Sequence, residues 1–289
     1  MKETLTVKQK QYLEQPNERI SGSEAIVRCL LAEGVDVLYG YPGGAIMPVY
    51  DELFKYQDKI HHVLTRHEQG ATHAAQGYAR ISGKVGVAIA TSGPGATNLI
   101  TGIADAQIDS TPIVCITGQV ASHLLGSDAF QETDVIGISM PVTKWNYQVT
   151  SADEIGPAIA KAFYIARTGR PGPVLVDITK DAQLEHTEFT YSKKTDVDSY
   201  VPVTAVSDKS LCAAADLINQ ASKPFVVFGQ GVILGKAETE FKRFIELTGI
   251  PAASTAMGLS ALESTHPLHM GMLGMHGNYA PNMLTNECD

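Results

Sequence analysis

The chain has 289 residues, of which 44% are hydrophobic and 18% are charged, a composition typical of a folded globular protein rather than a disordered one. Its 22 lysines and arginines are outnumbered by 31 aspartates and glutamates, which gives a formal net charge of −9. An acidic chain without a long basic run binds a phosphate backbone poorly, so nucleic acid is excluded as the main partner.

The length predicts about two domains. The four cysteines, Cys29, Cys115, Cys212 and Cys288, are far apart and form no CxxC pair, which argues against a zinc cluster and indicates reduced thiols. The polar N-terminus lacks the apolar region of a signal peptide, and no apolar run approaches the roughly 18 residues of a membrane span. We therefore expect a soluble cytoplasmic protein with no membrane partner.

Residues 1–20 are interpreted as a polar N-terminal arm, partly helical. From Ser21 to Lys180, apolar strands alternate with helical patterns, and several strands are continuous Val/Ile-rich runs. This order predicts an α/β domain with a doubly wound parallel sheet. The expected strands are Val35–Tyr39, His62–Thr65, Val85–Ala90, Ile113–Thr117, Asn146–Thr150 and Val174–Ile178. The expected helices are Ser23–Ala32, Ile46–Phe54, Gly70–Ile81, Thr97–Ala106 and Glu154–Arg167.

Residues 181–206 mix charge with Ser, Thr and Pro and show no apolar period, so they are interpreted as a linker. Residues 207–289 begin a second α/β unit. Its expected elements are the helix Ser207–Asn219, the strand Phe225–Phe228, the helix Glu238–Thr248 and a short strand near Ala252–Ser254. Open α/β sheets usually contain more strands than these two. We therefore expect that the second domain is truncated and that the chain is a fragment.

Glycine-rich turns follow three of the expected strands, at Gly40–Ala45, Thr91–Asn98 and Gly229–Gly231. Such turns at the carboxyl ends of parallel strands let backbone amides approach a ligand. From these residues alone, each is either a ligand-binding turn or an ordinary tight turn. None has the Walker A or GxGxxG spacing, which disfavours a P-loop nucleotide site and a nicotinamide dehydrogenase.

Glu68 follows the expected strand His62–Thr65 and precedes a helix with a close-packed alanine face. The helix N-terminus favours its charged form and desolvation favours its neutral form. These opposed effects suit a carboxyl group that must share a proton. The alternative interpretation is a helix-capping glutamate. The spacing from His67 to His73 is not HExxH, which excludes that zinc-protease motif.

Short motifs in order along the chain resemble the acetohydroxyacid (acetolactate) synthase large, catalytic subunits. They are GYPGGA at 40–45, RHEQGA at 66–71, TSGPGATN at 91–98, TGQV at 117–120, DAFQE at 128–132, TGRPGPVLVDITKD at 168–181, ELTGIPAAST at 246–255 and GMLGMHG at 271–277. The resemblance implies a thiamine diphosphate pyrimidine-binding domain at 21–180 and the first, FAD-side part of a central Rossmann-like domain at 207–289.

The resemblance also implies roles for individual residues. Glu68 matches the glutamate that hydrogen-bonds the aminopyrimidine ring and is the expected catalytic residue. The expected thiamine diphosphate contacts are Tyr41, Gly44, Glu68, Pro94, Asn98 and Gln131; the expected substrate contacts are Phe130, Gln131 and Lys180; and the expected FAD contacts are Arg170, Thr255, Met275 and His276. Two residues depart from the family pattern: Thr179 replaces a proline and Gln230 replaces a glycine.

The function implied is the condensation of two pyruvates, or of pyruvate and 2-oxobutanoate, with loss of CO₂, at the start of branched-chain amino-acid biosynthesis. It implies thiamine diphosphate, FAD and Mg²⁺, the metal ligands lying outside this chain, and a homodimer or higher oligomer with a regulatory small subunit as an option. We expect the fragment alone to be inactive, and the surface around Glu68, Asn98 and Gln131 to lie open. The alternatives are a sister thiamine enzyme, such as a pyruvate oxidase or a catabolic acetolactate synthase, and a non-catalytic domain.

Overall fold

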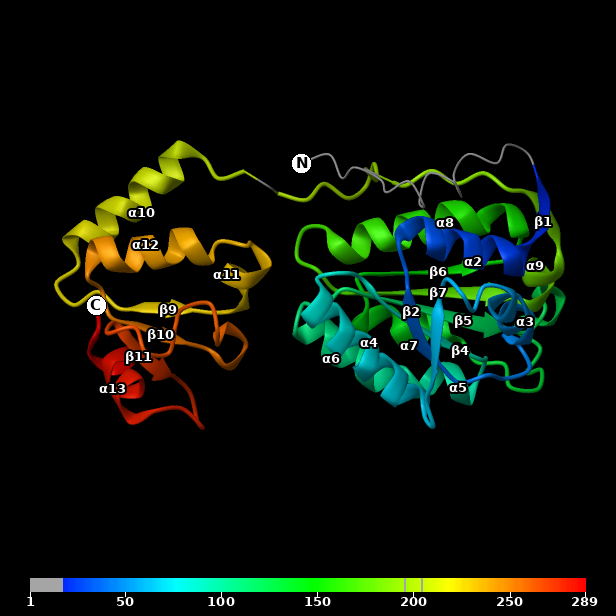
Figure 1. Ribbon diagram of the computed structural model, residues 1–289, viewed down its shortest axis with the longest axis horizontal. Helices are drawn as coiled ribbons and strands as arrows, with labels where there is room; N and C mark the ends of the chain where they lie inside the picture. The colour runs from blue at the N-terminus through cyan, green and yellow to red at the C-terminus, as the bar shows by residue number, and fades with distance from the viewer. Residues whose placement is uncertain (1–17, 195, 204) are drawn as a thin grey trace. The chain divides into compact units, whose positions relative to one another are not determined.

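The computed structural model describes residues 18–194, 196–203 and 205–289 (Figure 1). The chain divides into two compact units, one ending at Val203 and the other beginning at Thr204. No helix in these described ranges combines the length and the apolar character needed to cross a membrane.

The first unit is built on a six-stranded sheet with the order β3-β2-β4-β5-β7-β6, in which every paired strand is parallel to its neighbour. The strands are β2 (Val37–Gly40), β3 (His61–Leu64), β4 (Gly86–Ala90), β5 (Ile113–Gln119), β6 (Trp145–Val149) and β7 (Pro173–Thr179). All residues of β4, β5 and β7 are buried, as the continuous apolar runs predict for strands covered on both faces. The predicted fold class is confirmed.

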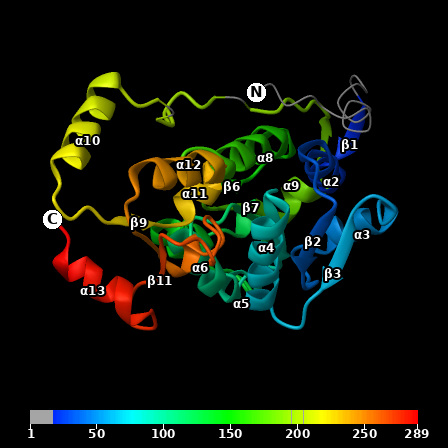
Figure 2. The ribbon, with the colours of Figure 1, turned by 60° about the vertical axis from the view of Figure 1, so that its left-hand side comes forward.

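Helices cover both faces of this sheet (Figures 1 and 2). One face packs against α2 (Gly22–Glu33), α3 (Met47–Lys55) and α8 (Ala152–Arg167) through a core that includes Ile26, Leu30 and Phe163. The other face packs against α4 (Glu68–Ser82) and α6 (Ile100–Ile108) through a smaller core rich in alanine. The short helices α5 (Pro94–Asn98), α7 (Val135–Ser139) and α9 (Lys180–Leu184) follow β4, β5 and β7.

The first part of the predicted linker is a folded part of the first unit, which corrects that interpretation. Residues 181–184 belong to α9, and β8 (His186–Glu188) pairs antiparallel with β1 (Arg19–Ser21), at the end of the predicted arm. Phe189 and Tyr191 are buried. The rest of the arm, residues 1–17, lies outside the described residues.

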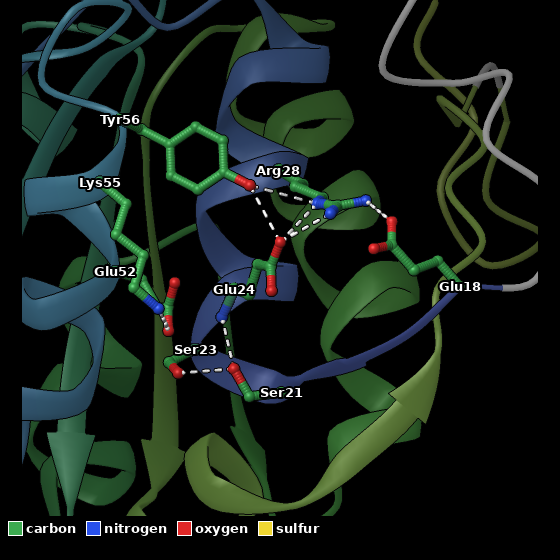
Figure 3. A network of polar contacts seen from close by, with 8 residues as sticks. All are labelled: Glu18, Ser21, Ser23, Glu24, Arg28, Glu52, Lys55 and Tyr56. Atoms are coloured by element: carbon green, nitrogen blue, oxygen red, sulfur yellow. Dashed lines mark hydrogen bonds and ion pairs between the residues drawn. The ribbon is translucent and has the colours of Figure 1, made fainter.

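A polar network fixes β1 beside the helices (Figure 3). The buried guanidinium of Arg28 in α2 donates to Glu18 at 2.8 Å and to Glu24 at 2.6 Å. The Tyr56 hydroxyl, just after α3, donates to the same Glu24 carboxylate at 2.9 Å. Three segments that are separate in the sequence therefore meet at one cation, and the start of the described chain is held against α2.

The second unit has a three-stranded parallel sheet with the order β11-β10-β9. Its strands are β9 (Val226–Phe228), β10 (Ala252–Ser254) and β11 (His269–Met272), and its helices are α10 (Asp208–Gln220), α11 (Gln230–Leu234), α12 (Glu238–Thr248) and α13 (Tyr279–Glu287). The core gathers around Phe228, Ile245 and Leu262. β11, α11 and α13 were not predicted.

Candidate active site

The site lies at the carboxyl ends of β2, β3 and β4. The chain leaves β2 toward β3 on one side and then returns to place β4 on the other side, so the order β3-β2-β4 contains a topological switch point. The turns that follow β2 and β4 diverge there, and open α/β sheets bind ligands at such a point. Tyr41, Gly44, Glu68, Pro94 and Asn98 all lie in the turns or first helices that follow these three strands.

Glu68 is the first residue of α4, two residues before the predicted helix start. His67 caps this helix, because its Nδ1 accepts a 3.1 Å hydrogen bond from the Gln69 backbone. Only 8% of Glu68 is exposed. The alanine face of α4 packs against the core of the first unit, and this packing also buries Glu68 at the start of the helix. The Glu68 carboxylate therefore lies at a helix N-terminus, which favours negative charge.

Asn98, at the end of α5, donates a hydrogen bond of 3.0 Å from Nδ2 to Oε2 of Glu68. The α5 backbone approaches closely, since a Cβ added to Gly95 would lie 3.3 Å from Oε1 of Glu68 and 2.7 Å from Cγ2 of Thr91. Among the described residues, Oε1 accepts no hydrogen bond and Glu68 forms no ion pair. One oxygen of a largely buried carboxylate is therefore positioned by the protein, and the other is available to a ligand.

A buried phenol, that of Tyr50, lies near enough to Glu68 to feel its charge. Burial raises the pKa of Tyr50 well above its usual value, and the charge of Glu68 adds to the shift, so the phenol stays protonated. The Tyr50 hydroxyl lies 3.3 Å from Nε2 of His62. Burial lowers the pKa of His62, which favours a neutral imidazole. Burial therefore favours the uncharged forms of both Tyr50 and its partner His62.

Thr91 holds the glycine-rich turn after β2 against the end of β4. Its Oγ1 accepts a 3.1 Å hydrogen bond from the Ala45 backbone. Tyr41, which is 44% exposed, and Gly44, also exposed, lie on this turn, and Pro94 is the exposed first residue of α5. The structure therefore brings the predicted cofactor residues Tyr41, Gly44 and Pro94 to the two turns that flank the switch point.

The predicted substrate residues follow β5 and β7 at the same edge of the sheet. Gly93 has a φ of +57°, and a Cβ there would lie 2.6 Å from the Gln131 carbonyl oxygen, so the backbone of Gln131 packs directly on the turn after β4. Phe130 is 88% exposed. Lys180 is the exposed first residue of α9, directly after β7.

The expected openness around Glu68 needs correction. Its own chain buries Glu68 and half-buries Asn98, whereas Gln131 is exposed. The cause is local: α5 closes over the start of α4, and the glutamate side chain points into that junction. The exposed candidate site residues are instead Tyr41, Gly44, Pro94, Phe130, Gln131 and Lys180.

The predicted FAD residues divide between the two units. Arg170 precedes β7, at the amino edge of the first sheet, where its guanidinium donates to Ser110 Oγ at 2.6 Å and to the Ile108 carbonyl at 2.8 Å. Thr255 follows β10, and its hydroxyl accepts from the Gly258 backbone at 3.2 Å. Met275 and His276 lie exposed after β11. The three residues of the second unit share the carboxyl edge of its sheet.

Sequence reasoning missed a buried polar cluster beneath the substrate residues, formed by Asp177 of β7 with Thr117, Gln119 and Gln148. The sequence feature that could have revealed this cluster is the aspartate within the apolar run VLVDI. An aspartate in a strand that is buried on both faces needs polar partners, so its presence indicates a buried polar cluster. Within the described part of the chain, no group of three or more His, Cys, Asp or Glu side chains could hold a metal ion.

Two family models match the chain. Residues 20–138 match the N-terminal TPP binding domain of thiamine pyrophosphate enzymes, and residues 211–289 match the central domain of the same enzymes. The first match contains Tyr41, Glu68, Asn98 and Gln131.

Curated proteins with similar sequences agree with these matches. The acetolactate synthase large subunit of Corynebacterium glutamicum is 54% identical over 260 residues, which is 90% of this chain and 41% of that protein. The probable acetolactate synthase large subunit of Methanocaldococcus jannaschii is 47% identical over 93% of this chain and 46% of its own length. The acetolactate synthase large subunit of Lactococcus lactis is 45% identical over 96% of this chain. The chain thus spans 41–48% of the length of these relatives.

Proposed function

The chain belongs to the thiamine pyrophosphate enzymes, as a homologue of acetolactate synthase large subunits, and on that premise we propose that it forms the Glu68 side of an acetolactate synthase active site. The proposed reaction joins two pyruvates to give 2-acetolactate, or pyruvate and 2-oxobutanoate to give 2-aceto-2-hydroxybutanoate. One CO₂ is released in each case. This chemistry begins the biosynthesis of branched-chain amino acids.

The observation that carries the proposal is the Glu68–Asn98 pair at the switch point of the first sheet. A carboxylate that is 8% exposed, with one oxygen held by Asn98 and the other without a protein donor among the described residues, fits an N–H group of the thiamine pyrimidine ring. When bound, thiamine diphosphate supplies the nucleophilic carbon that attacks the 2-keto group. The proposed role of Glu68 is to accept a proton from the ring nitrogen and to return it. The low exposure of Glu68 strengthens the hydrogen bond between its carboxylate and that nitrogen.

The surrounding residues are proposed to orient the cofactor and the substrate. Tyr41, Gly44, Pro94 and Asn98 border the pyrimidine end, because they lie on the turn after β2 and on α5, at the same edge of the sheet as Glu68. Phe130, Gln131 and Lys180 are assigned to the substrate side, since they follow β5 and β7 at the same edge.

The remaining partners are proposed from the family. FAD is assigned to Arg170, Thr255, Met275 and His276, and the 92% exposure of the apolar Met275 side chain suits packing against a planar ring. We assign the Mg²⁺ ligands to residues outside this chain. The proposed assembly is a cytoplasmic homodimer or higher oligomer, with a regulatory small subunit as a further partner.

Product analysis of the full-length protein that contains this chain tests the proposal. With thiamine diphosphate, Mg²⁺ and FAD, we expect acetolactate from pyruvate at one CO₂ per two pyruvates consumed. A pyruvate oxidase would instead consume O₂ and yield an acetyl product. Pyruvate turnover without acetolactate would therefore contradict the proposed reaction while leaving the family membership intact.

A further inference from the structure

The carboxylate of Asp177 lies inside the first sheet and is completely buried. It accepts hydrogen bonds from Thr117 Oγ1 at 2.6 Å, Gln148 Nε2 at 3.0 Å and Gln119 Nε2 at 3.1 Å. Burial raises its pKa above the usual value, although the three donors oppose that shift. Since no cation pairs with it among the described residues, this carboxylate is costly to bury, and its three neutral donors must each be held in place.

Gln119 links this buried carboxylate to the loop at residues 120–133. It is the last residue of β5 and only 1% exposed. Besides Asp177, its Nε2 donates to the Thr133 carbonyl at 3.0 Å, and its Oε1 accepts from the Val120 backbone at 2.9 Å. One amide group therefore binds both the first and the last residue of the loop, and the contact with Asp177 fixes the orientation of that amide.

The middle of the loop depends on this base. Glu132 binds the Ala129 backbone at 3.1 Å and the Gly126 backbone, so these bonds shape the loop internally without attaching it to the sheet. Phe130 is largely exposed, and Gln131 contacts the core of the unit through its backbone at Gly93. The positions of Phe130 and Gln131 are therefore set by the two ends of the loop, by the hydrogen bonds from Ser122 to Asp181 and by the Gly93 contact.

We propose that Gln119, oriented by Asp177, is a positioning residue that fixes the base of the 120–133 loop and thereby places Phe130 and Gln131 beside the substrate. Gln119 acts through the loop and does not itself touch the reacting groups. The assignment of Phe130 and Gln131 to the substrate rests on the proposed function, whereas the hydrogen bonds of Gln119 do not.

A matched pair of substitutions in the full-length protein separates positioning from stability. Gln119→Met and Gln148→Met each remove one amide donor from Asp177 Oδ2, but only Gln119→Met also releases Val120 and Thr133. Gln119→Asn is the alternative where the methionine variant does not fold, because its shorter side chain cannot reach both loop ends. Hydrogen exchange of peptides from 120–133, the KM for pyruvate and kcat are measured for each variant.

We expect Gln119→Met to speed exchange in 120–133 by about tenfold and to raise the KM for pyruvate about tenfold, since it loses the hydrogen bonds to both ends of the loop. Gln148→Met should lower thermal stability similarly while leaving both readouts within about twofold of wild type. Unchanged exchange in the Gln119 variant, or equal effects of the two variants on KM, would overturn the proposal. A wild type that forms no acetolactate would defeat the proposed function, and the exchange measurement would still show whether Gln119 holds the loop.

Discussion

Asn98 and Glu68 come from two different strand-to-helix connections and meet in a 3.0 Å hydrogen bond at the switch point of the first sheet. The Glu68 carboxylate is held between the start of α4 and the backbone of α5, where Gly95 leaves no room for a larger side chain. This arrangement orients one carboxylate oxygen and leaves the other for a ligand. The proposed proton transfer depends on that asymmetry.

Glu68→Gln in the full-length protein should lower kcat for acetolactate formation by about 10²–10⁴-fold, the usual range for a general acid–base group. The amide keeps the size of the side chain and can still accept from Asn98, but it cannot exchange a proton with a ring nitrogen. Steady-state kinetics with saturating thiamine diphosphate measure the effect, and circular dichroism checks the fold. A rate within about threefold of wild type would remove Glu68 from the mechanism.

Asn98→Ala should have a smaller effect, a loss of about ten- to a hundredfold in kcat/KM. Hydrogen bonds to charged groups contribute roughly 1.5–3 kcal/mol, and each 1.4 kcal/mol is a factor of about ten. The carboxylate remains in this variant but loses its fixed orientation. The same kinetic assay applies, and a loss as large as that of Glu68→Gln would mean that Asn98 has a chemical role of its own.

The main sheet could be predicted from the sequence because its buried strands are continuous Val/Ile-rich runs between glycine-rich turns. All six strands lie within two residues of their predicted bounds. β8 and β11 were missed because HTE and HMGM are short and lack a run of β-branched residues. The partner of β8 is β1, at the other end of the unit's sequence, and a local pattern cannot show such a pairing.

The candidate site was only partly predictable, for a similar reason. A carboxylate at a strand-to-helix junction identified Glu68, and the resemblance to a known family identified Asn98. The bond between the two residues spans 30 positions and depends on how α5 closes over α4, which no local pattern encodes. Asp177 was not predicted as part of a polar cluster because it lies within the apolar run that predicted β7, and its partners Thr117, Gln119 and Gln148 are on other strands.

Gly95→Ala should destabilise the first unit by about 1–3 kcal/mol, the usual cost of overpacking. The new Cβ would lie 2.7 Å from Cγ2 of Thr91, and Thr91 must then move from the Ala45 backbone that it holds. Gly77→Ala is the matched control within a helix. No atom lies within 4 Å of its Cβ position, so it should stabilise α4 by about 0.5–1 kcal/mol. Urea unfolding of both variants measures these changes, and the same sign for both would contradict the packing argument.

The carboxylate of Asp181 holds the start of the 120–133 loop. It accepts a 3.0 Å hydrogen bond from the Ser122 backbone and a second one from the Ser122 hydroxyl. Partial burial opposes its ionisation, but the Ser122 hydrogen bonds outweigh that effect and lower the pKa from 3.8 to about 2. A folded-state pKa below the unfolded value means that the contribution to stability is present above about pH 4 and is lost as the pH falls toward 2.

Asp181→Ala should therefore reduce the free energy of unfolding by about 1 kcal/mol at pH 7, and this difference from wild type should shrink as the pH falls from about 4 toward 2. Urea unfolding at several pH values measures it. Ser122→Ala removes the hydroxyl donor of the same pair, so the double variant should lose less than the sum of the two single losses. A loss that grows as the pH falls, or fully additive effects, would show that the Ser122 bonds do not stabilise the ionised carboxylate.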